Sequence, residues 1–117
     1  MKVYGIKTCG SVKKALKFFK NHDISYEFVD FRKEPVGLDT IKRWLKQVSL
    51  EVLFNKRGTK YRTLKLKELN LDDAQKIQWL ADENMLIKRP VIEFEDQIIV
   101  AFDEAKYQSQ FLKQPPL

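Results

Sequence analysis

Cys9, the one cysteine of this 117-residue chain, is the first side chain that could do chemistry. It lies in a polar turn, residues 7–11, between a strand-like run at 2–6 and residues that recur at helical spacing from Val12 onward. Free N–H groups and the dipole at the start of a helix stabilise negative charge, so this turn favours a nucleophilic thiolate. The alternative is a small buried apolar residue, as many lone cysteines are. The position of Cys9 favours the chemical role.

A single cysteine limits what that chemistry is. No internal disulfide can form, and neither a CxxC pair nor a cysteine–histidine zinc cluster is possible, so we expect no metal site. A thiolate that has formed a mixed disulfide or an oxyanion adduct needs a second thiol to release it. That thiol must come from glutathione, another small thiol or a glutaredoxin, and we expect no bound cofactor.

Strands and a helix must position Cys9. Residues 2–6 and 25–31 have the apolar pattern of strands, and residues 12–20 between them carry an apolar face of helical period. Strand, helix and strand in this order predict a βαβ unit with parallel strands. Near the other end, residues 91–94 and 98–100 flank a short turn and predict a β-hairpin.

A last helix is predicted from Asp103 to about Phe111, and Pro115 and Pro116 end any helix there. Between the two β units, a helical segment is predicted over about residues 34–86. Its helices are expected over 38–48, at 50–54 and from about Asp72, because apolar residues recur there at helical spacing. Trp44 and Trp79 fall on these helices and are expected to pack in the core.

Arg89 and Pro90 are the second candidate for chemistry. The pair directly precedes the first strand of the predicted hairpin. A βαβ unit followed by a ββα unit with proline at this place resembles the thioredoxin arrangement, in which that proline is cis and its loop abuts the reactive cysteine. The resemblance implies that Arg89 lies beside Cys9, where a guanidinium stabilises a thiolate and an anionic substrate.

The composition predicts a globular protein with anionic partners. Twenty-two Lys and Arg residues against sixteen Asp and Glu residues give a net charge of +6, and 44% of the residues are hydrophobic. No run approaches the roughly 20 apolar residues that span a bilayer, and residues 1–7 do not read as a secretory leader. We therefore expect a cytoplasmic protein without membrane contact.

Residues 55–67 form a basic run that holds six cations and no acid. Three interpretations remain open: a solvated face, a docking surface for an acidic partner, and a nucleic-acid site. Direct nucleic-acid binding is the least favoured, because Tyr61 is the run's one aromatic residue and base stacking uses several.

Four separated segments resemble the glutaredoxin-dependent arsenate reductase and Spx-like family. They are residues 4–15 (YGIKTCGSVKKA), 53–62 (LFNKRGTKYR), 87–91 (IKRPV) and 101–105 (AFDEA). The likeness covers nearly the whole chain, in the family's order. It implies an α/β, thioredoxin-like fold: βαβ and ββα units form a mixed four-stranded sheet, with an inserted helical subdomain, in one domain over residues 1–117.

The chain departs from that family's pattern at three positions. Arsenate reductases of the family hold the oxyanion with three arginines; Arg89 matches one, whereas the other two positions fall at Asn55 and near Ala101. Spx-type regulators carry a CxxC whose second position is Val12 here. The resemblance therefore implies a single-cysteine branch, and arsenate is disfavoured because two guanidinium groups are missing.

These observations predict a small thiol oxidoreductase. Cys9 and Arg89 are its expected catalytic residues, and the expected substrate-binding residues are Gly10, Ser11, Lys13 and Pro90. The alternative is an Spx-like transcriptional regulator that binds RNA polymerase through residues 55–67 without catalysis.

Overall fold

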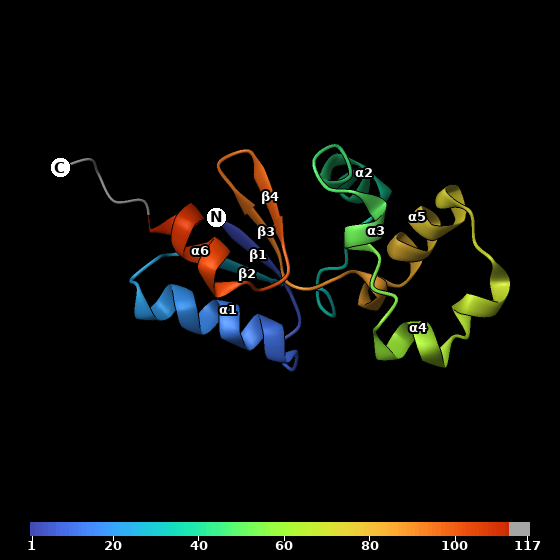
Figure 1. The fold of residues 1–117 in the computed structure, drawn as a ribbon, viewed down its shortest axis with the longest axis horizontal. Coiled ribbons are helices and arrows are strands. Elements are labelled where there is room, and N and C mark those ends of the chain that lie inside the picture. Colours follow the sequence, from blue (N-terminus) through green and yellow to red (C-terminus); the bar gives the residue numbers. More distant parts are fainter. Residues whose placement is uncertain (113–117) are drawn as a thin grey trace.

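The computed structural model describes residues 1–112 and contains a four-stranded sheet in the order β2-β1-β3-β4 (Figure 1). Its strands are β1 (Lys2–Gly5), β2 (Glu27–Asp30), β3 (Val91–Phe94) and β4 (Gln97–Val100). β1 pairs with β2 in parallel, whereas β1–β3 and β3–β4 are antiparallel. This mixed sheet confirms the predicted thioredoxin-like fold. Pro115 and Pro116, which were expected to end any helix, lie outside the described residues.

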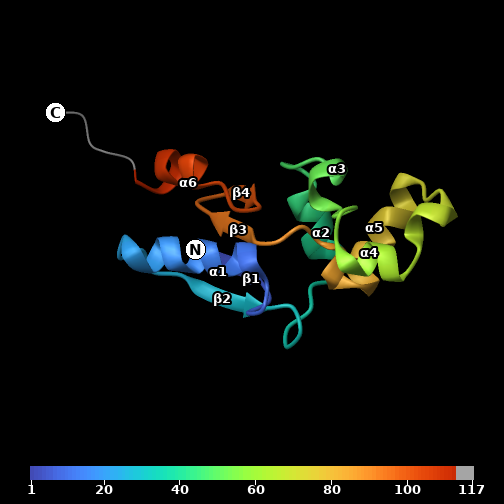
Figure 2. The same ribbon diagram turned by 60° about the horizontal axis from the view of Figure 1, so that its bottom comes forward.

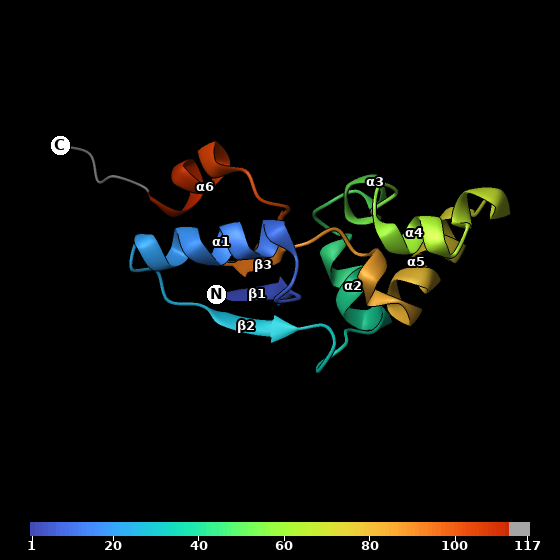
Figure 3. The same cartoon turned by 90° about the horizontal axis from the view of Figure 1, so that it is seen from below.

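Helices α1 (Gly10–Asn21) and α6 (Glu104–Phe111) cover one face of the sheet (Figure 3). The reason is the apolar period of α1, which turns Val12, Ala15, Phe18 and Phe19 inward. Ala15 and Phe19 pack with Val3 of β1 and with the fully buried Tyr107 of α6. The βαβ and ββα units therefore share this half of the core.

The opposite face of the sheet contacts the segment between β2 and β3, which is helical as predicted (Figure 2). Trp44 and Ile41 are fully buried there and belong to the same apolar cluster as Tyr4 of β1 and Val91 of β3. Trp79 is partly buried against that cluster. The helical elements of the segment are α2 (Leu38–Trp44), α3 (Leu50–Leu53), α4 (Thr59–Thr63), η1 (Leu66–Leu69), α5 (Asp73–Asp82) and η2 (Asn84–Leu86).

Local side-chain chemistry fixes several boundaries. α5 begins with a capping box, in which the Gln75 N–H donates to the Asp72 carboxylate at 2.8 Å and the Asp72 N–H donates to the Gln75 side chain at 2.9 Å. The β3–β4 turn places both Glu95 and Asp96 at positive φ, as a tight hairpin turn requires.

Residues 55–69 differ from the expectation, since no helix was predicted there and two short ones form. α4 buries no residue, and η1 is flanked by Lys65 and Asn70, which both have left-handed backbone conformations. Without an apolar face, α4 has no sequence period by which it could be predicted.

Candidate functional site

Cys9 caps the N-terminus of α1, directly after the loop that follows β1. Its N–H donates to the carbonyl of Ile6 at 3.3 Å, and its own carbonyl accepts the N–H of Lys13 at 3.0 Å. The backbone of Cys9 is extended (φ −78°, ψ 127°), which turns the side chain toward the free N–H groups of the first helical turn. The thiol is partly exposed, so the structure places it where a dissolved substrate has access.

The surroundings of Cys9 lower the pKa of its thiol. Burial alone would raise this pKa, but the Val12 N–H, the Arg89 guanidinium and the Ser11 N–H together outweigh burial. Each of these three donor groups stabilises the negatively charged thiolate more than the neutral thiol. A larger thiolate fraction at neutral pH follows, and the thiolate is the nucleophile.

Arg89, which lies in the loop before β3, is the second residue of this site. The Arg89–Pro90 peptide bond is cis, as the thioredoxin resemblance implied. The guanidinium Nη1 donates to the carbonyl of Met85 at 2.9 Å and lies 3.8 Å from the Met85 sulfur, which fixes the side chain. Its Nε is buried and has no hydrogen-bond partner among residues 1–112. Arg89 therefore keeps a donor that is unpartnered within the described residues, and the same guanidinium group stabilises the Cys9 thiolate.

The predicted substrate-binding residues are brought together only in part. The Ser11 N–H and Arg89 both act on the thiol, whereas Gly10 and Lys13 are exposed and neither is among the groups that shift the Cys9 pKa. Pro90 is buried, and its carbonyl accepts the Ala101 N–H at 2.8 Å. The N–H of Val12 was not anticipated as part of the site. The sequence signal that could have identified it is the position of Val12 in the first helical turn, where backbone N–H groups have no partner within the helix.

Asn55, which the resemblance places at the second family arginine, is held both by the distant Leu86 and within its own loop. Its N–H donates to the carbonyl of Leu86 at 2.9 Å, and its side-chain oxygen accepts the Arg57 N–H at 3.2 Å. A Cβ on Gly58 would lie 2.8 Å from the Asn55 amide nitrogen, so a larger residue there would require the Asn55 side chain to move. Asn55 therefore shapes the loop and carries no charge for an oxyanion.

Ala101, which the resemblance places near the third family arginine, has a left-handed backbone with φ 72°. Two hydrogen bonds hold it there, because its N–H reaches the Pro90 carbonyl and its own carbonyl accepts the Tyr107 hydroxyl at 2.7 Å. A residue with a Cβ is disfavoured in this conformation by about 1–2 kcal/mol.

Replacing Ala101 with glycine is expected to stabilise the protein by about 0.5–1 kcal/mol. The gain is smaller than the backbone penalty it removes, because glycine also makes the unfolded chain freer. Urea unfolding measures it. Ala105→Gly in α6 is the matched control, and this same chemical change within a helix should destabilise by a comparable amount. A destabilised Ala101→Gly variant would contradict the assignment of strain to Ala101.

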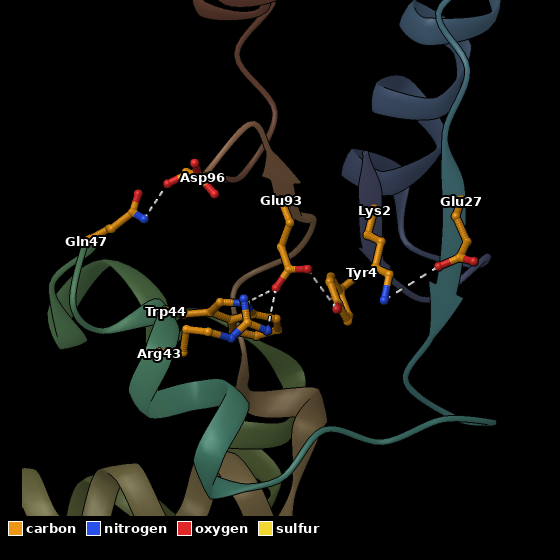
Figure 4. Close-up of polar contacts among 8 residues, drawn as sticks. All are labelled: Lys2, Tyr4, Glu27, Arg43, Trp44, Gln47, Glu93 and Asp96. Atoms are coloured by element: carbon orange, nitrogen blue, oxygen red, sulfur yellow. Dashed lines mark hydrogen bonds and ion pairs between the residues drawn. The ribbon is translucent and has the colours of Figure 1, made fainter.

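Glu93 of β3 joins the sheet to α2 (Figure 4). One carboxylate oxygen accepts the Tyr4 hydroxyl at 3.0 Å, and the other accepts the Trp44 indole N–H at 2.8 Å and lies 2.8 Å from the Arg43 guanidinium. Burial raises the pKa of this carboxyl, but the three donors outweigh it and the net pKa is lowered. Burial and the Glu93 charge raise the pKa of Tyr4 to about 12, so Tyr4 stays a neutral donor.

Within residues 1–112, no group of His, Cys, Asp and Glu side chains is placed to hold a metal ion. The same part of the chain contains no helix with the length and apolar character needed to cross a bilayer.

The chain belongs to the ArsC family, whose model matches residues 4–110. It is 38% identical to an uncharacterized protein of Haemophilus influenzae over 93% of this chain and 96% of that protein. An arsenate reductase (ArsC) related protein of Brucella melitensis has a solved structure that superposes with a TM-score of 0.74 at 36% identity, covering 94% of this chain and 92% of that one. The resemblance inferred from the sequence motifs is thereby confirmed.

The family likeness extends to regulators. The global transcriptional regulator Spx of Listeria innocua is 26% identical to this chain over 87% of it and 79% of that protein. The relatives thus include proteins named after an arsenate reductase and proteins named as regulators of transcription.

Proposed function

We propose that this protein is a glutathione-dependent thiol oxidoreductase that uses the Cys9 thiolate. The observation that carries the proposal is the setting of Cys9 at the start of α1, where two helix N–H groups and Arg89 lower the pKa of its thiol against the effect of burial. The matched family includes proteins named for arsenate reduction, which supports a reductase class. A reducing compartment such as the cytoplasm suits a protein whose one thiol must stay free.

The proposed cycle has two exchanges. The Cys9 thiolate attacks the glutathione sulfur of a mixed disulfide R–S–S–G; the Cys9–glutathione bond forms as the R–S bond breaks, and R–S⁻ leaves with the electron pair. A second glutathione, as its thiolate, attacks the glutathione sulfur on Cys9. Oxidised glutathione leaves and Cys9 returns as a thiolate, while the proton of the second glutathione goes to R–S⁻. A glutaredoxin thiol would serve in the second exchange equally well.

An oxyanion adduct is the second reaction open to the same thiolate. Arg89 would stabilise such an anion, but Asn55 and Ala101 supply no charge where the family's other two arginines stand. Each missing charged contact is worth about 1.5–3 kcal/mol, so mixed disulfides are the favoured substrates over arsenate.

Arg89→Met tests this proposal. The variant removes the guanidinium but keeps an apolar stem, so we expect the thiol pKa to rise and kcat/KM for a glutathione mixed disulfide to fall about tenfold or more. Turnover is followed by coupling oxidised glutathione to glutathione reductase, and the thiol pKa by the pH dependence of alkylation. Lys17→Met, on the exposed face of α1, is the charge-matched control. Absence of turnover by the unmodified protein would contradict the proposed function.

A non-catalytic regulator remains the second candidate, favoured by the likeness to Spx and by the basic residues 55–67. In this candidate the chain binds RNA polymerase through that run. Co-sedimentation with purified RNA polymerase separates the two functions: a stoichiometric complex that persists in Cys9→Ser, together with no turnover by the unmodified chain, would favour regulation.

A further inference from the structure

The surface around the α3–α4 loop is hollowed in three places that share two residues. Hollows of ≈ 440, 260 and 330 Å³ are each lined by both Phe54 and Lys56. The three hollows border one another at these residues, between α3, α4 and α5, and we call their combined lining the Lys56 groove. No step of the proposed chemistry uses this groove.

Cations dominate the Lys56 groove. Arg57 and Lys88 line one end, and Lys67 and Lys76 line the other. None of these side chains, nor that of Lys56, forms an ion pair with another of residues 1–112. The carboxylates among the lining residues are those of Glu51 and Asp73. The groove is therefore complementary to a ligand with several negative charges.

The groove also presents apolar surface. Val52, which is 51% exposed, lines the end that contains Lys88. Phe54 lies in the floor and packs edge-on against Tyr61, with the ring centroids 5.8 Å apart. Leu50 and Leu71 line the adjoining hollows. A matching ligand carries apolar side chains among its acids.

One end of the groove is tied to the Cys9 site. The Lys88 N–H donates to the carbonyl of Leu53 at 2.8 Å, and Phe54 forms an antiparallel bridge with Ile87. Lys88 is the residue directly before Arg89, so their Cα atoms are about 3.8 Å apart. Because Arg89 acts on the Cys9 thiol, consecutive residues belong to the groove and to the thiol site.

We propose that the Lys56 groove docks an acidic segment, with interspersed apolar residues, of the protein whose mixed disulfide is reduced at Cys9. This inference rests on the proposed function, because it names the substrate class of the same thiol. The shared lining of three hollows argues for an extended protein segment, since a ligand as short as a tripeptide would leave most of the groove unfilled. Docking holds the substrate disulfide near the thiolate and does not alter the thiol itself.

Binding is measured without any disulfide chemistry. A fluorescein-labelled ten-residue peptide of alternating Glu and Leu, with serine in place of its central cysteine, is titrated with the full chain at low salt, and anisotropy is recorded. We expect saturable binding that weakens about tenfold in Lys56→Glu/Arg57→Glu and weakens further as salt rises. Lys17→Glu/Lys20→Glu changes the net charge equally on α1 and should bind as the unmodified chain does.

Absence of saturable binding, or an equal loss in the α1 control, would overturn the docking proposal. A single-stranded oligonucleotide that binds more tightly than the peptide and loses affinity in the same groove variant would also overturn it, because the groove would then be a nucleic-acid site.

The turnover arm links docking to the substrate. The same peptide with its cysteine glutathionylated should have a kcat/KM about tenfold above that of a Gln-for-Glu version, and Lys56→Glu/Arg57→Glu should abolish this preference. The unmodified chain and Lys56→Glu/Arg57→Glu should turn over the mixed disulfide of glutathione with cysteine equally. If the unmodified chain shows no preference for the acidic peptide, the substrate assignment is overturned. If the unmodified chain binds the peptide but turns over none of these substrates, the proposed function is wrong instead.

Discussion

Cys9→Ser is expected to lose turnover of glutathione mixed disulfides by on the order of a thousandfold or more. A serine hydroxyl cannot form a disulfide, and no other thiol exists in the chain to replace the lost sulfur. The coupled oxidised-glutathione assay described above measures the loss. Retained turnover in this variant would show that the chemistry does not pass through Cys9.

The same substitution should leave the fold intact, so the loss of turnover can be assigned to chemistry. Cys9 occupies the N-cap of α1, and serine is among the best residues at that position because its oxygen accepts a helix N–H. Urea unfolding of Cys9→Ser should therefore give a free energy of unfolding equal to or above that of the unmodified chain. This stability measurement is the control for the activity assay.

Glu93→Gln is expected to destabilise the protein by about 2–3 kcal/mol, because it removes a charge that accepts from three donors. The Trp44 indole, the Tyr4 hydroxyl and the Arg43 guanidinium all meet at this carboxylate, whose side chain is only 18% exposed. In the amide, an NH₂ group replaces one acceptor and faces donors. Thermal or urea unfolding measures the change.

Glu27→Gln is the matched control, since Glu27 is also a strand residue with a cationic partner. Its carboxylate lies 3.8 Å from the Lys2 ammonium, and both side chains are more than half exposed, so its loss should cost less than about 1 kcal/mol. Equal effects in the two variants would contradict the structural role assigned to Glu93.

The stability contributed by Glu93 should also depend on pH. The folded protein lowers the pKa of this carboxyl, so the unfolded state binds the proton more readily. The contribution is therefore present above the ordinary glutamate pKa of about 4.3 and is lost as the pH falls through the folded pKa. The Glu93→Gln variant, which cannot titrate there, should lack that part of the acid dependence.

The fold and the centre of the site were predictable because local signals coincided there. The apolar period of residues 12–20, the hairpin at 91–100 and the proline after Arg89 each specify local geometry, and together they leave few topologies. Cys9 was placed in the turn at the same boundary between strand and helix, and the structure makes it the N-cap of α1. Whether it is catalytic stays a prediction that the experiments above decide.

Glu93 could not be identified in this way. In the sequence it is a polar residue in a short strand, and its partners Tyr4 and Trp44 are 89 and 49 positions away. Trp44 was correctly predicted to lie in the core, but the need of its buried indole N–H for an acceptor does not say which carboxylate supplies it. Such a cluster depends on tertiary packing, which no periodic pattern encodes.

Only the basic character of the Lys56 groove could be predicted from the sequence. The six cations of residues 55–67 indicated a basic surface, but Lys60 pairs with Glu83 at 3.6 Å, and Lys88 joins the surface from a distant segment. The bridge between Phe54 and Ile87 brings these segments together. A count of charges along the chain cannot separate a paired lysine from a free one.

Mass spectrometry of the adduct on Cys9 tests the central claim most directly. The chain is mixed with one equivalent of a glutathionylated peptide, quenched in acid and digested. We predict that one glutathione appears on the peptide containing Cys9, that free substrate peptide is released in equal amount, and that added glutathione removes the adduct. A Cys9 thiol that remains unmodified while the substrate stays glutathionylated would contradict the account.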